Sequence, residues 1–153
     1  MALISPADAS KVADFFRERL VNPVTIDLFT EKKSMLFVPG RRECEYCEET
    51  EKLLGEVAAL SDQIRLNVHD LRNDPDAGES FGINADMIPA FILGGSARGT
   101  LRFFGIPAGY EFASLLQDLG DVSTAETSLS DAAKASLDGL SADVHIRVFV
   151  TPT

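Results

Sequence analysis

The chain has 153 residues, of which 45% are hydrophobic, and it carries a formal net charge of −10. This length suits one domain with a sizeable core. The negative charge argues against a nucleic-acid-binding surface, because neutralising phosphates requires clustered Lys and Arg. No apolar stretch approaches the roughly 20 residues of a transmembrane helix, and no signal-peptide pattern is visible. We therefore expect a cytoplasmic protein that binds neither nucleic acid nor membrane.

Hydrophobic periodicity predicts an α/β fold, in the order helix, strand, strand, helix, strand, helix, strand, strand, helix. Such an order is typical of a central mixed sheet flanked by helices. The expected helices are Pro6–Leu20 with Ser5 as its cap, Cys47–Leu60, a short one near Ala77–Phe81, and Gly109–Leu119. The expected strands are Val24–Thr30, Ser34–Val38, Ile64–Val68, Ile88–Leu93 and Thr100–Phe104.

The C-terminal part of the chain has a different character. Residues 1–120 form the expected main unit, and residues 121–143 are a linker rich in Ser, Ala and Asp with a short helix at Ser130–Leu137. Residues 144–153 read as the first strand of a second unit that is missing. An apolar strand left exposed invites edge pairing. We expect residues 144–150 to dock on their own sheet or to pair with a second copy, giving a homodimer.

Cys44 and Cys47 are the only cysteines in the chain, and they lie one helical turn apart. They follow the apolar run Met35–Val38 and open a helical pattern, while Pro89 heads a later apolar run. In a cytosolic protein, such a pair is more often catalytic or metal-binding than structural. Two thiols at the start of a helix, with a proline available to face them, indicate a dithiol–disulfide exchanger.

The helix N-terminus favours a thiolate at Cys44, because the unsatisfied backbone N–H groups and the macrodipole stabilise negative charge. Cys44 is therefore expected to attack, and Cys47, one turn in and more buried, to resolve the mixed disulfide. Four carboxylates and two cations flank the pair: Glu43, Glu45, Glu48, Glu49, Arg41 and Arg42. The excess of negative charge predicts a less depressed Cys44 pKa and a more reducing couple. For Glu48 and Glu49, ordinary complementation of the helix dipole explains the pattern equally well.

Pro89 matters to this hypothesis if its peptide bond is cis, because that isomer turns the Ile88 backbone towards an extended substrate. We expect Tyr46, Ile88 and Pro89 to bind the substrate. The histidines, His69 and His145, are expected to be structural or solvent-facing.

These residues carry a resemblance to a known family. The leading helix, Cys44-Glu45-Tyr46-Cys47, Ile88-Pro89-Ala90, and Phe104 to Phe112 resemble the N-terminal thioredoxin-like unit of the protein disulfide oxidoreductases, which are glutaredoxin-like proteins built from two tandem thioredoxin folds. The resemblance implies a thioredoxin-like fold, a redox pair at Cys44 and Cys47, and a cis-proline at Pro89. The chain departs from the family by stopping where a second CxxC is expected. The apolar run Met35–Val38 also lacks the usual buried carboxylate.

The sequence thus predicts a thiol–disulfide oxidoreductase that acts on protein disulfides or dithiols, is served by an unidentified electron donor, and needs no cofactor or metal. Two alternatives stay open. In one, two chains share zinc or an iron–sulfur cluster through their CxxC pairs. In the other, the pair is a static disulfide in a redox-inert interaction module.

Overall fold

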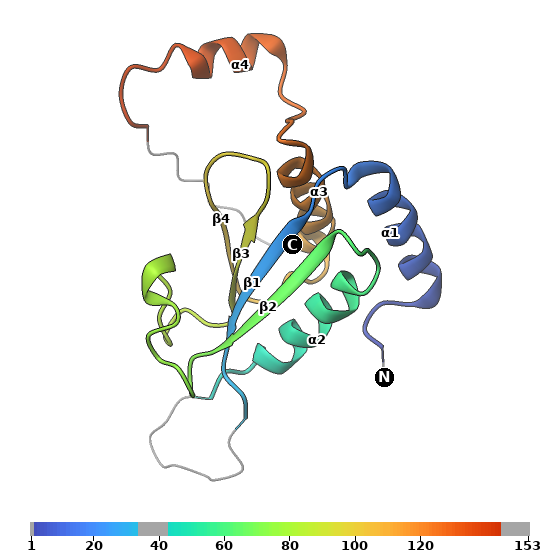
Figure 1. Cartoon of the computed structure of the whole chain (residues 1–153), viewed down its shortest axis with the longest axis vertical. Coiled ribbons are helices and arrows are strands. Elements are labelled where there is room, and N and C mark those ends of the chain that lie inside the picture. The colour runs from blue at the N-terminus through green and yellow to red at the C-terminus, as the bar shows by residue number, and fades with distance from the viewer. Residues whose placement is uncertain (1, 34–42, 145–153) are drawn as a thin grey trace.

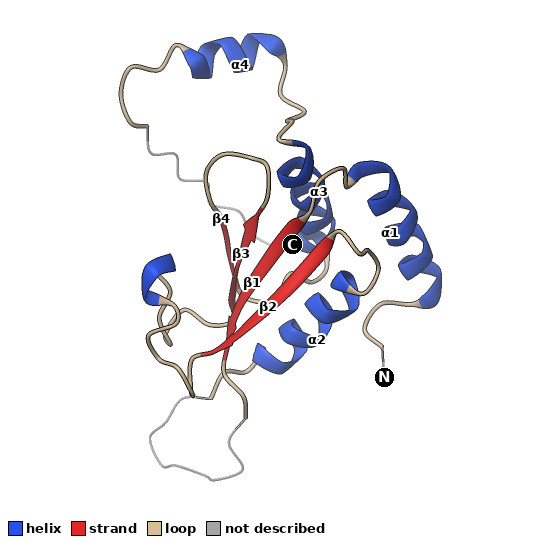
Figure 2. Cartoon of the chain, in the orientation of Figure 1, coloured by secondary structure: helices blue, strands red, loops and turns tan. Residues whose placement is uncertain are grey.

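A computed structural model describes residues 2–33 and 43–144 (Figure 1). Helices and strands are mixed along the chain, with β3 and β4 consecutive and α3 and α4 last, as the secondary-structure colouring in Figure 2 shows. The helices are α1 (Pro6–Arg19), α2 (Cys47–Ala58), α3 (Tyr110–Thr124), α4 (Asp131–Asp138) and the 3₁₀ turn η1 (Glu79–Phe81). The strands are β1 (Val24–Thr30), β2 (Ile64–Asp70), β3 (Ala90–Gly94) and β4 (Leu101–Phe104).

The four strands form one mixed sheet in the order β2-β1-β3-β4. Strand β1 pairs in parallel with β2, and β3 is antiparallel to both β1 and β4. The register places Thr30 opposite Asp70, and Phe29 opposite Ala90. The C-terminal ends of β1 and β2 therefore meet the start of β3 at one edge of the sheet.

The main core lies between the sheet and the three helices α1, α2 and α3, which lie on the same side of the sheet (Figure 1). Strand β1 contributes three side chains that are completely buried there: Val24, Ile26 and Leu28. This alternation, with Thr25 and Asp27 between them, is expected for a strand that packs one face on the core. A smaller cluster around Phe29, Leu71 and Ile83 covers part of the opposite face, where the chain between β2 and β3 folds back.

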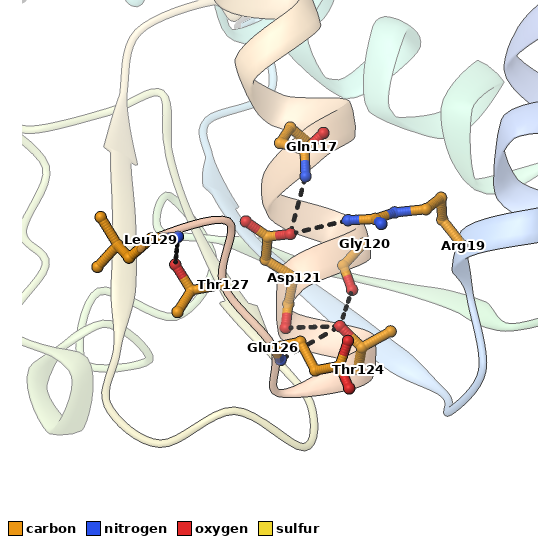
Figure 3. Close-up of polar contacts among 8 residues, drawn as sticks. All are labelled: Arg19, Gln117, Gly120, Asp121, Thr124, Glu126, Thr127 and Leu129. Carbon is orange, nitrogen blue, oxygen red and sulfur yellow. Dashed lines mark hydrogen bonds and ion pairs between the residues drawn. The ribbon is translucent and has the colours of Figure 1, made fainter. Parts of the chain in front are cut away.

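The end of the sheet at which β1 and β2 begin is held by polar contacts from α3. The Ser123 hydroxyl accepts from the backbone N–H groups of Val21 and Asn22, at 2.9 Å each, and donates to the Asn22 carbonyl at 2.7 Å. Asp121 accepts from Arg19 at 3.1 Å and from Gln117 at 2.8 Å (Figure 3). These contacts fix α3 to α1 and to the turn that enters β1.

The α/β fold class is confirmed, and most expected elements form. Ser5 caps α1, β1 has the expected bounds, and a short helix follows Ser130. Several elements differ at their ends. Helix α2 stops at Ala58, β2 continues to Asp70, and β3 runs from Ala90 to Gly94 instead of from Ile88 to Leu93. Helix α3 continues to Thr124 because Val122 and Ser123 are buried against the core, and the remaining differences are of one or two residues. The expected strand at 34–38, and all of that at 144–150 except Val144, lie outside the described residues, so the division into domains stays a prediction. No helix among the described residues is long and apolar enough to cross a membrane.

Candidate active site

Cys44 and Cys47 form a disulfide at the start of α2, with their Cα atoms 5.5 Å apart. Cys47 is the first residue of the helix and is 1% exposed, whereas Cys44 precedes the helix and is only half-buried. The expectation that Cys47 is the more buried cysteine is confirmed. The difference follows from the helix, which carries Cys47 on the face that packs against the sheet with Leu54 and Val57.

The Ile88–Pro89 peptide bond is cis, which confirms the expected isomer. It lies directly before β3, and the backbone N–H of Gly105 donates to the Pro89 carbonyl at 2.7 Å. Ile88 itself packs against the smaller core cluster. The segment before β3 is thus anchored both to the chain that follows β4 and to the core.

Cys44 and Pro89 line the same cavity, of about 230 Å³, which brings the expected site residues together. Tyr46 and Ile88 also line this cavity, and Tyr46 is 44% exposed. The full lining is Glu31, Glu43, Cys44, Glu45, Tyr46, Ala85, Asp86, Ile88 and Pro89. A roomier depression of about 540 Å³ lies near Asp121, at the other end of the sheet, and contains none of these residues.

Glu31 is a site residue that sequence reasoning missed. It follows β1 directly, and its side chain is 11% exposed, with Oε1 3.3 Å from Nε of Arg72. Arg72 follows β2, so the pair joins the ends of two parallel neighbours. The signal was available in the sequence, because parallel strands bring the residues after their C-terminal ends to one edge of the sheet.

Two buried hydroxyl groups at this end of the sheet form no hydrogen bond within the described part of the chain. Thr30 at the end of β1 and Thr50 in α2 are 1% and 0% exposed, and neither Oγ1 has a partner among residues 2–33 and 43–144. Thr50 lies three residues after Cys47, and side chains at that spacing share one face of a helix. Buried polar groups are usually hydrogen-bonded, so unpaired ones call for an explanation. Sequence alone gives no signal for them, because threonine occurs on strands and helices of every kind.

Glu48 and His69, two other polar residues considered in the sequence analysis, contact neighbouring side chains of the fold. Glu48 lies 3.5 Å from Lys33, an ion pair between two exposed side chains. His69 contacts Asp27 of the neighbouring strand at 3.1 Å and stacks on Phe29 with 4.8 Å between ring centroids. His145 lies outside the described residues. Across residues 2–33 and 43–144, no group of three or more His, Cys, Asp or Glu is arranged to hold a metal ion.

Comparison with solved structures identifies the fold. A protein disulfide oxidoreductase from Aeropyrum pernix superposes with a TM-score of 0.70 and 27% identity, over 89% of this chain and 55% of that one. The alkylhydroperoxide reductase protein AhpF of Enterococcus faecalis superposes with a TM-score of 0.70 and 22% identity, over 90% of this chain and 61% of that one. A separate structure of the N-terminal domain of AhpF gives a TM-score of 0.68, 21% identity, and coverage of 88% and 59%.

The chain spans little more than half the length of these proteins. No protein-family model matches the sequence, and no curated protein matches it. The solved structures share a thioredoxin-like fold, and the similarity to a protein disulfide oxidoreductase expected from the motifs is confirmed. This chain has a thioredoxin-like fold that carries a CxxC disulfide, and together these support thiol–disulfide oxidoreductase chemistry at the general level.

Proposed function

We propose that this protein exchanges disulfides with protein substrates, with Cys44 as the nucleophile and Cys47 as the resolving thiol. The observation that carries the proposal is the unequal exposure of the two sulfur-bearing residues. Cys44 opens onto the cavity that holds the cis-proline, while Cys47 is 1% exposed beneath it. A buried thiol cannot reach the disulfide of a large substrate, but it can attack its neighbour one turn away.

The reaction needs only the two cysteines and a substrate disulfide. In the reduced protein, the Cys44 thiolate attacks one substrate sulfur, a mixed disulfide forms, and the other substrate sulfur leaves as a thiolate. Cys47 then loses its proton, attacks Cys44 Sγ, and releases the second substrate thiolate. The substrate gains two electrons and two protons, and the protein is left with the Cys44–Cys47 disulfide. An external dithiol returns it to the reduced state.

The substrate is expected to lie across Tyr46, Ile88 and Pro89. Tyr46 presents an aromatic side chain beside Cys44, and both line the cavity with the cis peptide unit. An extended peptide held there by main-chain hydrogen bonds to the Ile88 segment gains affinity from its backbone, while its side chains supply specificity. This mode of binding suits an enzyme that acts on protein disulfides.

Reduction of insulin with dithiothreitol as electron donor tests the proposal. We expect turnover in the wild type, its loss in Cys44→Ser, and accumulation of a mixed disulfide in Cys47→Ser, because that variant forms the first covalent intermediate without resolving it. Trapping through Cys47 in the Cys44→Ser variant would contradict the assigned roles. Turnover no faster than dithiothreitol alone in the wild type would contradict the function. A metal content of half an equivalent per chain would instead favour a site shared between two chains.

A further inference from the structure

We propose that the active site selects substrates that carry basic residues beside the disulfide. This inference rests on the proposed function and adds the chemical class of the substrate segment. Four of the nine residues lining the Cys44 cavity are acidic: Glu31, Glu43, Glu45 and Asp86. None of the lining residues in the described part of the chain is basic. The cavity that receives the disulfide is therefore a concave surface of one charge sign, which focuses the electrostatic field.

Three of these carboxylates face solvent at the rim. Glu43 and Glu45 flank Cys44 in the sequence and are exposed, and Asp86 is exposed on the side of the cis-proline. A substrate disulfide that reaches Cys44 enters a cavity whose lining includes these three carboxylates. Residues beside the substrate cysteines therefore come close to negative charge.

Nearby cations offset part of this charge, and the three rim carboxylates Glu43, Glu45 and Asp86 carry the rest. Arg72 is paired with Glu31 at 3.3 Å, and Lys33 with Glu48 at 3.5 Å. Lys32 and Lys33 are not in the lining of the Cys44 cavity. With Lys52, Glu48 and Glu51 they line a neighbouring depression that shares Glu31 with that cavity. Arg41 and Arg42 precede the site in the sequence, and Glu43, Glu45 and Glu49 outnumber them when the Lys33-paired Glu48 is left out.

The chemistry strengthens this preference. Exchange proceeds through a thiolate, and its negative charge spreads over the reacting sulfurs as the new bond forms. Carboxylates around Cys44 oppose that charge, whereas a lysine or arginine brought by the substrate offsets it. A basic flank is therefore attracted before reaction and is favourable during reaction. An acidic flank is unfavourable at both stages.

The test uses three disulfide peptides that differ only in the residues flanking their cysteines, which are Lys, Gln or Glu. Pre-reduced protein is mixed with each peptide, and the rate constant for oxidation of the protein is divided by the rate constant for reduction of the same peptide by dithiothreitol. At about 0.01 M ionic strength we expect a Lys-to-Glu ratio of at least about tenfold. At about 1 M salt, where the Debye length is about 3 Å, the ratio should fall to about twofold.

Charge-neutral variants locate the effect. The double variant Glu43→Gln/Glu45→Gln should reduce the low-salt ratio to about threefold or less, because two rim charges are gone. Any change that it causes in the reactivity of Cys44 affects the three peptides alike and cancels from the ratio. The matched control is Glu18→Gln/Asp62→Asn, which removes two exposed charges near the other end of the sheet. Strand β1 spans seven residues, so that end is about 20 Å away. The control should keep the wild-type ratio.

Each outcome decides between the proposals. Equal rates for the three peptides, with the Gln peptide reacting well, would overturn the charge preference and leave the exchange function standing. Equal losses in both double variants would also overturn it, because the protein's net charge would then be responsible rather than the rim. If none of the three peptides oxidises the wild type faster than it oxidises the Cys44→Ser variant, the exchange function is overturned. The charge preference then falls with it.

Discussion

The two ends of the sheet use polar residues in opposite ways. At the end where β1 begins, the buried Ser123 hydroxyl makes three hydrogen bonds, and Asp121 accepts from two side chains. At the end where β1 finishes, the buried hydroxyls of Thr30 and Thr50 make none, and the carboxylates gather around a half-buried cysteine. The first arrangement is typical of a structural joint. The second leaves buried hydroxyls without a partner among the described residues, which calls for an explanation.

The comparison shows that burial alone does not say what a polar group is for. Ser123 and Thr50 are both 0% exposed, both belong to helices on the same face of the sheet, and both have a single hydroxyl group. Apart from the threonine methyl group, they differ in whether that hydroxyl is hydrogen-bonded within the described residues. Replacing each with a residue that lacks the hydroxyl should therefore change the free energy of unfolding in opposite directions.

The largest effect is expected for Ser123→Ala. This change leaves two backbone N–H groups and one carbonyl without their protein partner, so we expect a loss of about 2 kcal/mol in the free energy of unfolding. In a chain of this size that corresponds to a fall in Tm of roughly 4–8 °C, measured by calorimetry or circular dichroism. Ser136→Ala is the control, because the Ser136 hydroxyl is exposed and makes a single hydrogen bond, to a carbonyl within α4. Similar losses in both variants would show that the joint at Ser123 is not special.

A gain is expected for Thr50→Val in the oxidised protein. Valine keeps the branched shape and removes a buried hydroxyl that has no partner, so stability should rise by about 1 kcal/mol. Thr124→Val is the matched control. The Thr124 hydroxyl donates to the Gly120 carbonyl at 3.0 Å, so removing it should lower the free energy of unfolding. A clear loss of stability in Thr50→Val would mean that its hydroxyl is satisfied in solution, and the contrast between the two ends would fail.

The sequence predicted the fold well because local patterns and the sheet agree. Apolar residues alternate with polar ones in β2, at Ile64 and Leu66, and in β1, and this alternation predicts where the two strands lie. The cap Ser5 and the first-turn residue Pro6 predict where α1 begins. The end of α3 was predicted too early, at Leu119. The polar residues after it resemble a linker, but the contacts of Ser123 with the turn before β1 extend the helix by another turn. Only the tertiary structure supplies that information.

The candidate site was predicted in part. The pair of cysteines and the cis bond at Pro89 have clear local signals, and their shared cavity agrees with the hypothesis. Glu31 was missed because Met35–Val38, the apolar run nearest to the cysteines, was the strand expected to precede them. In the structure, β1 is an inner strand of the sheet, and Glu31 follows it at the end of the sheet where the Cys44 cavity lies. The roles of the individual residues stay proposals for the variants above to test.

The smallest effect concerns Asp118, in α3 at the structural end. Burial, and then the negative charge of Asp121, raise the pKa of Asp118 above its ordinary value of 3.8. Compared with the unfolded chain, the folded protein therefore favours the protonated carboxyl group of Asp118. The associated stability is fully present below pH 3.8 and is lost as the pH rises through the raised pKa. At neutral pH, Asp118→Asn should stabilise the protein by about 0.5 kcal/mol, a small value because solvent screens a partly exposed group.

The pH dependence of this gain in stability tests its cause. The gain from Asp118→Asn should shrink as the pH is lowered and vanish below about pH 3.8, because both proteins are then neutral at that position. Urea unfolding of the two proteins at several pH values measures the difference. A gain independent of pH would show that Asn stabilises α3 by its shape or hydrogen bonding, and that the carboxylate at Asp118 carries no strain in the folded protein.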